Sequence, residues 1–222
     1  MADPACHQLV REALDTIARL RIRKTPALRE VRRTLSRRVK SLPPDTVLTI
    51  AAELVANGPR WVGYELINQH PGALRALSLK SVRALGAGNA SWQDVDAFGV
   101  LVAGPAWMLG RVTDAAVLRW AASPDLWWRR TALVATTVLN SRSRGGRGDV
   151  QRTLAVVDRL KHDREDMVVK AVSWALRSLV VWDRTAVDRY LAANAAILHA
   201  RVRREVGNKL RTGRKNPGRV SG

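Results

Sequence analysis

The sequence predicts an all-α protein in which antiparallel helix pairs stack into a curved solenoid. Three observations support this prediction. Apolar residues recur at helical spacing, chain-breaking residues separate segments of helical length, and a weak pattern repeats about every 34 residues. Together they predict about a dozen helices of roughly 8–18 residues and no strands.

Helical spacing is clearest in residues 168–179, where apolar residues recur every three or four positions, as one helix face requires. Proline and glycine divide the chain at intervals that suit short helices. These breakers are Pro43-Pro44, Gly58-Pro59, Pro71-Gly72, Gly86-Ala87-Gly88, Gly104-Pro105 and Pro124. Ser91, Thr113 and Asp125 are predicted to begin later helices, because a short polar side chain there can accept a hydrogen bond from a free backbone N–H group.

The repeat aligns five segments that start at residues 58, 91, 125, 166 and 199, so that the intervals are 33, 34, 41 and 33 residues. The clearest pair is Asp125-x-x-Trp128-Arg129-x-x-Ala132 and Asp166-x-x-Val169-Lys170-x-x-Ser173. The long interval contains an Arg-Gly-rich loop insertion at 141–148. A period near 34 in a helical sequence indicates stacked helix pairs.

An acidic residue, a small apolar residue and a basic residue in this register are typical of HEAT-like and ARM-type repeats. One helix pair cannot bury its own apolar faces, so such repeats stack and form a continuous concave surface. We expect a single HEAT-like domain over residues 1–217 with a concave basic groove. A basic helical arm at about 1–41 begins this domain, and a short tail at 218–222 follows it.

The charge predicts a polyanionic partner. The formal net charge is +19, from 38 Lys and Arg against 19 Asp and Glu. Residues 11–40 carry a net +8 and residues 199–222 a net +7, whereas the 158 residues between them contribute +5. Two basic ends around a balanced middle favour DNA or RNA. The alternative is compositional drift toward Arg, Ala and Val, which raises the charge without a function.

Several classes of protein do not fit the sequence. Cys6 is the only cysteine, and the four histidines are scattered without ligand spacing, so neither disulfides nor a metal is expected. No apolar run approaches a membrane span, and the first residues do not resemble a signal peptide. We therefore expect a cytoplasmic protein, associated with the nucleoid when it binds DNA. A monomer is expected as well. HExxH, GxSxG and phosphate-loop patterns do not occur, and Gly145-Gly146-Arg147-Gly148 indicates only a flexible loop.

Eight tryptophans are many for this length. Four lie among apolar neighbours and are predicted to belong to the core: Trp61, Trp107, Trp120 and Trp182. The run Trp127-Trp128-Arg129-Arg130 is different, because consecutive helical positions lie about 100° apart. At least one tryptophan and one arginine should therefore reach a surface or groove, where they suit stacking and phosphate contact. The alternative is that they decorate an interface between repeats.

Trp92 and Asp96 are four residues apart near a predicted helix start, so they share one face. An aromatic ring beside a carboxylate suits a pocket for a cation. The alternative is that Asp94 or Asp96 only stabilises the N-terminus of the helix.

Three segments, in order, resemble successive parts of the DNA alkylation repair family of the AlkD type. They are Ser91-Trp92-x-x-Val95-Asp96, Trp127-Trp128-Arg129-Arg130-Thr131-Ala132 and Lys170-Ala171-Val172-Ser173-Trp174-Ala175-Leu176-Arg177. The C-terminal run 202–210, followed by Thr212-Gly213-Arg214-Lys215-Asn216-Pro217, is similar to members of the same family. The resemblance covers roughly residues 25–217 and depends on the order and spacing of these segments.

This resemblance implies a HEAT-like glycosylase that removes positively charged N3- or N7-alkylated purines from duplex DNA without a metal or cofactor. The catalytic residues it implies are Trp92, Asp96, Arg130 and Trp174. Further DNA contacts are expected from Arg129, Lys170, Arg203, Arg204 and Lys209. The chain departs from its relatives at Ser91, where they can have a second tryptophan, in the insertion at 141–148, and in its short basic N-terminal arm.

The implied chemistry is consistent with these residue types. A cationic alkylpurine leaves as a neutral base and needs no general acid, while the sugar becomes oxocarbenium-like and a fixed carboxylate stabilises it. Asp96 would face the sugar and position the attacking water. Trp92 and Trp174 would pack on the deoxyribose and backbone, and Arg130 would hold a flanking phosphate. The base would not enter a deep pocket.

Two other functions are consistent with a helical solenoid. A catalytically silent binder could recognise damaged or branched DNA by shape, and it would need the basic ends but not Asp96. A protein-interaction solenoid is the commonest use of such repeats, but a concave face rich in Arg and Trp fits it poorly.

Overall fold

The structure is a computed structural model that describes residues 4–21 and 25–217. Within these ranges the chain forms helices and no strands, which confirms the predicted all-α class. The helices are α1 (Pro4–Arg19), α2 (Thr25–Val39), α3 (Pro44–Asn57), α4 (Arg60–Gln69), α5 (Ala73–Ala76), α6 (Leu79–Gly86), α7 (Trp92–Phe98), the π-helix η1 (Gly99–Ala103), α8 (Gly104–Met108), α9 (Asp114–Ala121), α10 (Leu126–Leu139), the 3₁₀-helix η2 (Arg142–Arg144), α11 (Val150–Leu160), α12 (Asp166–Leu179), α13 (Arg184–Ala193) and α14 (Ala200–Thr212).

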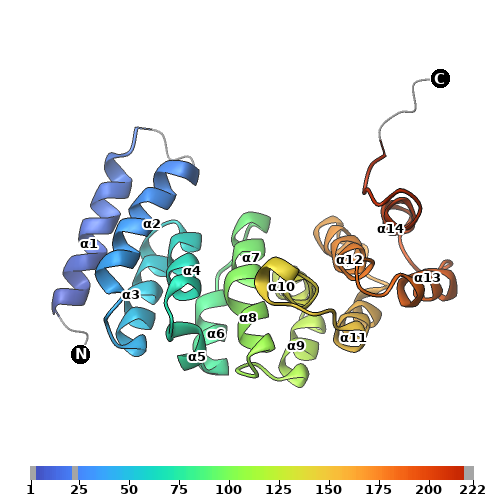
Figure 1. Cartoon of the computed structure of the whole chain (residues 1–222), viewed down its shortest axis with the longest axis horizontal. Coiled ribbons are helices and arrows are strands. Elements are labelled where there is room, and N and C mark those ends of the chain that lie inside the picture. The colour runs from blue at the N-terminus through green and yellow to red at the C-terminus, as the bar shows by residue number, and fades with distance from the viewer. Residues whose placement is uncertain (1–3, 22–24, 218–222) are drawn as a thin grey trace.

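The helices stack along the long axis of the molecule (Figure 1). We call α2, α4, α7, α10, α12 and α14 the upper row, because each packs on the next and together they run along the upper side of the view (Figure 1). Helices α3, α5, α9 and α11 lie below this row (Figure 1). This arrangement is the predicted α-solenoid.

The predicted register matches the upper row. The five predicted starts fall within two residues of the first residues of α4, α7, α10, α12 and α14. Polar contacts between successive repeats have the same period. Arg32 donates to Glu65, Arg130 to Asp96 and Arg201 to Asp166, across 33, 34 and 35 residues respectively. The repeat therefore reflects one contact pattern used several times along the stack.

The predicted helix starts are confirmed at all three capping residues. The side chain of Ser91 accepts a hydrogen bond from the backbone N–H of Asp94 at the start of α7. Thr113 and Asp125 do the same at the starts of α9 and α10. Each cap satisfies a backbone donor that the helix itself leaves free.

Several helices are shorter than the expected 8–18 residues. Helices α5 and α8 have four and five residues, and α7 has seven. However, α7, η1 and α8 follow one another without leaving helical backbone geometry, so residues 92–108 form one rod that a π-helical turn interrupts. The predicted break at Gly104-Pro105 falls inside this rod, where the proline occupies the first turn of α8.

Two of the four tryptophans predicted for the core are buried there. Trp107 and Trp120 are 2% and 6% exposed. Trp61 and Trp182 are half-buried and pack against the same cluster. The predicted basic arm corresponds to α1 and α2, which pack against each other, although residues 1–3 and 22–24 lie outside the described ranges. The predicted tail at 218–222 also lies outside them.

The insertion at 141–148 is a loop, as predicted, and it contains the short helix η2. The backbone N–H of Gly146 donates to Ser141 within the loop, and that of Gly148 donates to Leu139, the last residue of α10. The guanidinium of Arg142 lies 4.8 Å from the centre of the Trp182 ring. In the part of the chain that the structure describes, no helix is long and apolar enough to cross a membrane.

Candidate active site

A buried ion pair joins Asp96 on α7 to Arg130 on α10. The Nε and Nη2 groups of Arg130 each donate to one carboxylate oxygen of Asp96 at 2.9 Å. The remaining Nη1 group donates to the backbone carbonyl of Met167. The Arg130 side chain is only 6% exposed, whereas that of Asp96 is 20% exposed. A parallel two-bond contact fixes the carboxylate in one orientation while leaving part of it open to solvent.

Two glycines bring the rod at 92–108 close to α10. A Cβ atom at Gly99 would lie 2.6 Å from the Val134 side chain, and one at Gly104 would lie 2.6 Å from Val138. Side chains at these positions would therefore push α7 and η1 away from α10. The amide of Asn68 on α4 donates to the backbone carbonyl of Leu101, within the π-helical turn, at 2.9 Å. Single π-helical turns often occur at functional sites, and this one begins three residues after Asp96.

Trp92 is the first residue of α7, and its side chain is the exposed aromatic group nearest to Asp96 along the chain. It is 49% exposed, which is unusual for a large apolar residue. Its position one helical turn before Asp96 places the two on the same side of α7, as the spacing predicts.

The charge on Asp96 responds to two opposing effects. Burial disfavours the ionised form and raises the pKa of this carboxyl above its ordinary value, while the hydrogen bonds and charge of Arg130 lower it. Burial is the larger effect, so the pKa of Asp96 is raised overall. A carboxylate that is held in place and incompletely solvated interacts strongly with a positive charge placed beside it.

The run at 127–130 divides its side chains among different environments. Trp128 packs edge-on against Phe98 and lies 5.2 Å from Trp120, ring centre to ring centre. Trp127 is half-buried. Arg129 donates to Asp163 at 2.7 Å and to the carbonyl oxygens of Ser123 and Pro124. Both arginines are therefore engaged within the protein, and Arg130 does not present the free guanidinium that a phosphate contact requires.

Trp174 on α12 lines a pocket of about 450 Å³ between the end of α10, the insertion, α12 and α14. Val100, four residues after Asp96, lines the same pocket. The other lining residues are Thr137, Asn140, Ser141, Arg144, Arg177, Ser178, Val181, Lys209 and Lys215. Trp174 and Val100 thus line one pocket, and no hydrogen bond joins Trp174 to Asp96 among the described residues.

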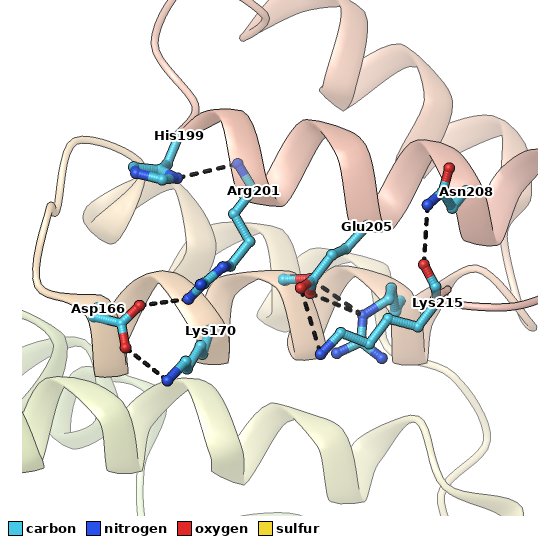
Figure 2. A network of polar contacts seen from close by, with 9 residues as sticks. Asp166, Lys170, His199, Arg201, Glu205, Asn208 and Lys215 are labelled. Carbon is cyan, nitrogen blue, oxygen red and sulfur yellow. Dashed lines mark hydrogen bonds and ion pairs between the residues drawn. The ribbon is translucent and has the colours of Figure 1, made fainter. Parts of the chain in front are cut away.

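The remaining predicted DNA contacts belong to α12 and α14, the helices that hold Lys170 and Arg203, Arg204 and Lys209 respectively. Lys170 forms an ion pair of 2.6 Å with Asp166, which also accepts from Arg201 (Figure 2). Arg203 and Arg204 are exposed on α14. The ammonium group of Lys209 donates to the carbonyl of Gly213 at 2.7 Å.

A second buried carboxylate, Glu205, was not predicted. It accepts a hydrogen bond of 2.6 Å from Ser173 and lies 3.4 Å from the Lys215 ammonium and 4.0 Å from Arg177 (Figure 2). The roles of Met167 and Asn68 were also missed. Glu205 lies 32 residues after Ser173, so the repeat period was a signal that could have identified this pair.

Within residues 4–21 and 25–217, no group of three or more His, Cys, Asp or Glu side chains gathers as metal ligands. A family model described as DNA alkylation repair enzyme matches residues 21–210 of this chain. No curated protein and no solved structure gives a significant match.

Proposed function

The chain belongs to the DNA alkylation repair enzyme family, and from the geometry of its site we propose that it is a DNA glycosylase. Its substrates are positively charged N3- or N7-alkylated purines in duplex DNA, and the reaction is hydrolysis of the N-glycosidic bond. The observation that carries the proposal is the Asp96 carboxylate, fixed by two bonds from Arg130, partly open to solvent, and one helical turn from the exposed Trp92.

Asp96 supplies the electrostatic stabilisation. As the bond to the base lengthens, positive charge moves from the alkylated purine onto the sugar, and the carboxylate faces that developing charge. No proton has to be delivered to the base, because it leaves in its neutral form. The same carboxylate positions the water molecule that attacks the sugar.

Arg130 is a positioning residue in this mechanism. Its contacts with Asp96 and Met167 hold the carboxylate in place before substrate binds, so no reorganisation is needed during the reaction. Its hydrogen bond and positive charge also lower the pKa of Asp96 and so oppose part of the effect of burial. Trp92 offers an exposed ring on which the deoxyribose can pack.

DNA binding is attributed to the upper row and to the basic ends of the chain. The concentration of positive charge at 11–40 and 199–222 supports non-specific contacts with phosphates on both sides of the site. Exposed Arg203 and Arg204 contribute to the C-terminal part of this surface. The upper row supplies the concave basic groove along which the duplex lies.

The test is single-turnover release of N7-methylguanine from methylated duplex DNA at saturating enzyme. Asp96→Asn nearly preserves shape and should lower the rate about 10²–10³-fold, as is typical when one preorganised electrostatic contact is removed. Asp94→Asn is a matched control on the same helix, because Asp94 contacts Ser91 rather than Arg130. It should keep nearly full activity.

DNA affinity separates the possible outcomes. It should barely change in Asp96→Asn, because this carboxylate does not bind phosphate. If the wild-type protein binds DNA but releases no base, the chain is a silent DNA-binding member of the family. Equal rates for the wild type and Asp96→Asn would show that Asp96 is not catalytic.

A further inference from the structure

The pocket beside Trp174 is strongly basic. Four positively charged side chains line it, and they come from four different segments of the chain. Arg144 belongs to the insertion, Arg177 to α12, Lys209 to α14, and Lys215 to the turn that follows α14. Trp174 and Val181 contribute apolar surface to the same pocket.

The charges in this pocket are not balanced by the protein. Glu205 is the carboxylate that contacts the cluster among the described residues, so four positive charges against one negative charge leave a surplus of three. The Arg177 side chain uses Nε in a hydrogen bond to Ser173, while its two terminal nitrogens have no hydrogen-bond partner within the described ranges. Burial lowers the pKa of Arg177, as expected for a cation that an anion could stabilise further.

Arg144 is the member of the cluster that is free to reach a ligand. It is exposed, and its guanidinium has no hydrogen-bond partner in the part of the chain that the structure describes. The backbone beside it is held in place, because Gly146 and Gly148 bond back to Ser141 and Leu139. The insertion therefore presents an unpaired guanidinium from an anchored loop.

We propose that this pocket binds one backbone phosphate of the DNA strand close to the lesion, and that Arg144 of the insertion completes it. The inference rests on the proposed function and adds a role for the insertion. Val100 lines the pocket about one helical turn beyond Asp96, so the bound phosphate lies within a few nucleotides of the reacting sugar. A phosphodiester suits the surplus of positive charge, and its attached deoxyribose can pack on the Trp174 ring.

The experiment measures binding of a duplex that carries an N7-methylguanine, in which single phosphates near the lesion are replaced, one at a time, by neutral methylphosphonates. Wild type should lose about three- to fivefold in affinity at one position within a few nucleotides of the lesion, the size expected of one partly exposed ionic contact. In Arg144→Ala the loss at that position should become smaller, because Arg177, Lys209 and Lys215 still line the pocket. Arg147→Ala is the matched control, because Arg147 is an exposed arginine of the same insertion that does not line the pocket.

The deciding quantity is how much the affinity lost at each methylphosphonate differs between wild type and the Arg144→Ala variant. If Arg144→Ala and Arg147→Ala respond to every methylphosphonate as wild type does, the pocket does not hold a phosphate and the proposal is overturned. If Arg144→Ala and Arg147→Ala reduce the methylphosphonate effect equally, the proposal is also overturned. That result would indicate a general attraction of the positively charged loop for DNA, not a specific phosphate contact. The experiment measures DNA affinity and does not require base release, so a catalytically silent protein can still confirm the phosphate pocket. A protein that binds no DNA refutes both this proposal and the proposed function.

Discussion

Removing Arg130 should destabilise the protein substantially. In Arg130→Ala, the Asp96 carboxylate loses two hydrogen bonds and its compensating charge, and the Met167 carbonyl loses a donor. Leaving one member of a buried ion pair without its partner typically costs about 3–5 kcal/mol. Because the Asp96 side chain is 20% exposed, water can solvate part of the charge, and we expect a loss of about 2–4 kcal/mol at neutral pH.

The loss should depend on pH in a defined direction. Arg130 lowers the pKa of Asp96, so its removal raises that pKa further above the unfolded value. A raised folded-state pKa means that the penalty is absent when the carboxyl is protonated and grows as pH rises through the folded pKa. Urea unfolding followed by circular dichroism should therefore show a larger deficit for Arg130→Ala at about pH 7 than at about pH 4.

The double variant Asp96→Asn/Arg130→Ala is the control, because it has no carboxyl group to titrate at this position. Its deficit relative to Asp96→Asn should not grow with pH. A deficit for Arg130→Ala below about 1 kcal/mol, or one of equal size at both pH values, would refute the reasoning about this ion pair.

Three further predictions concern catalysis, packing and DNA binding. The rate of base release should fall on acidification at a pH above that of an ordinary aspartate, and this acid limb should be absent in Asp96→Asn, as a pH profile of single-turnover rates would show. Gly99→Ala should lower the free energy of unfolding in urea by about 1–3 kcal/mol, because its Cβ atom would lie 2.6 Å from a valine side chain. The control Gly207→Ala should lower it by less than about 1 kcal/mol, because its Cβ atom would meet only the end of a flexible arginine. The affinity for unmodified duplex DNA should fall steeply as the salt concentration rises. The double variant Arg203→Glu/Arg204→Glu should bind the duplex more weakly than wild type. An affinity that does not change with salt would exclude phosphate binding.

The sequence predicts the solenoid well because the same local signals recur in each repeat. Helical spacing, the capping residues Ser91, Thr113 and Asp125, and the period near 34 all act over short stretches of chain. Because these three signals agree with one another, they together predict stacked helix pairs.

The details of the site depend on contacts between repeats, which these local signals do not specify. The family resemblance implies that Asp96 and Arg130 act in one site, but the burial of Arg130 and its contact with Met167 depend on how closely α7 and α10 approach each other. Gly99 and Gly104 allow that approach. The pair Gly104-Pro105 predicts a break, whereas in the structure it belongs to a continuous rod. The basic pocket was missed because its residues come from distant segments, including an insertion that interrupts the repeat.

The central claim is that a fixed carboxylate stabilises the positive charge that develops on the sugar as an already cationic base leaves. Its most direct test is chromatography of the free bases released by wild-type protein from two duplexes, one with N7-methylguanine and one with hypoxanthine, a neutral lesion. The account predicts release of N7-methylguanine and no release of hypoxanthine above the rate without protein, because the proposed mechanism delivers no proton to a neutral leaving base. Equal release of both bases, or release of neither, would contradict it.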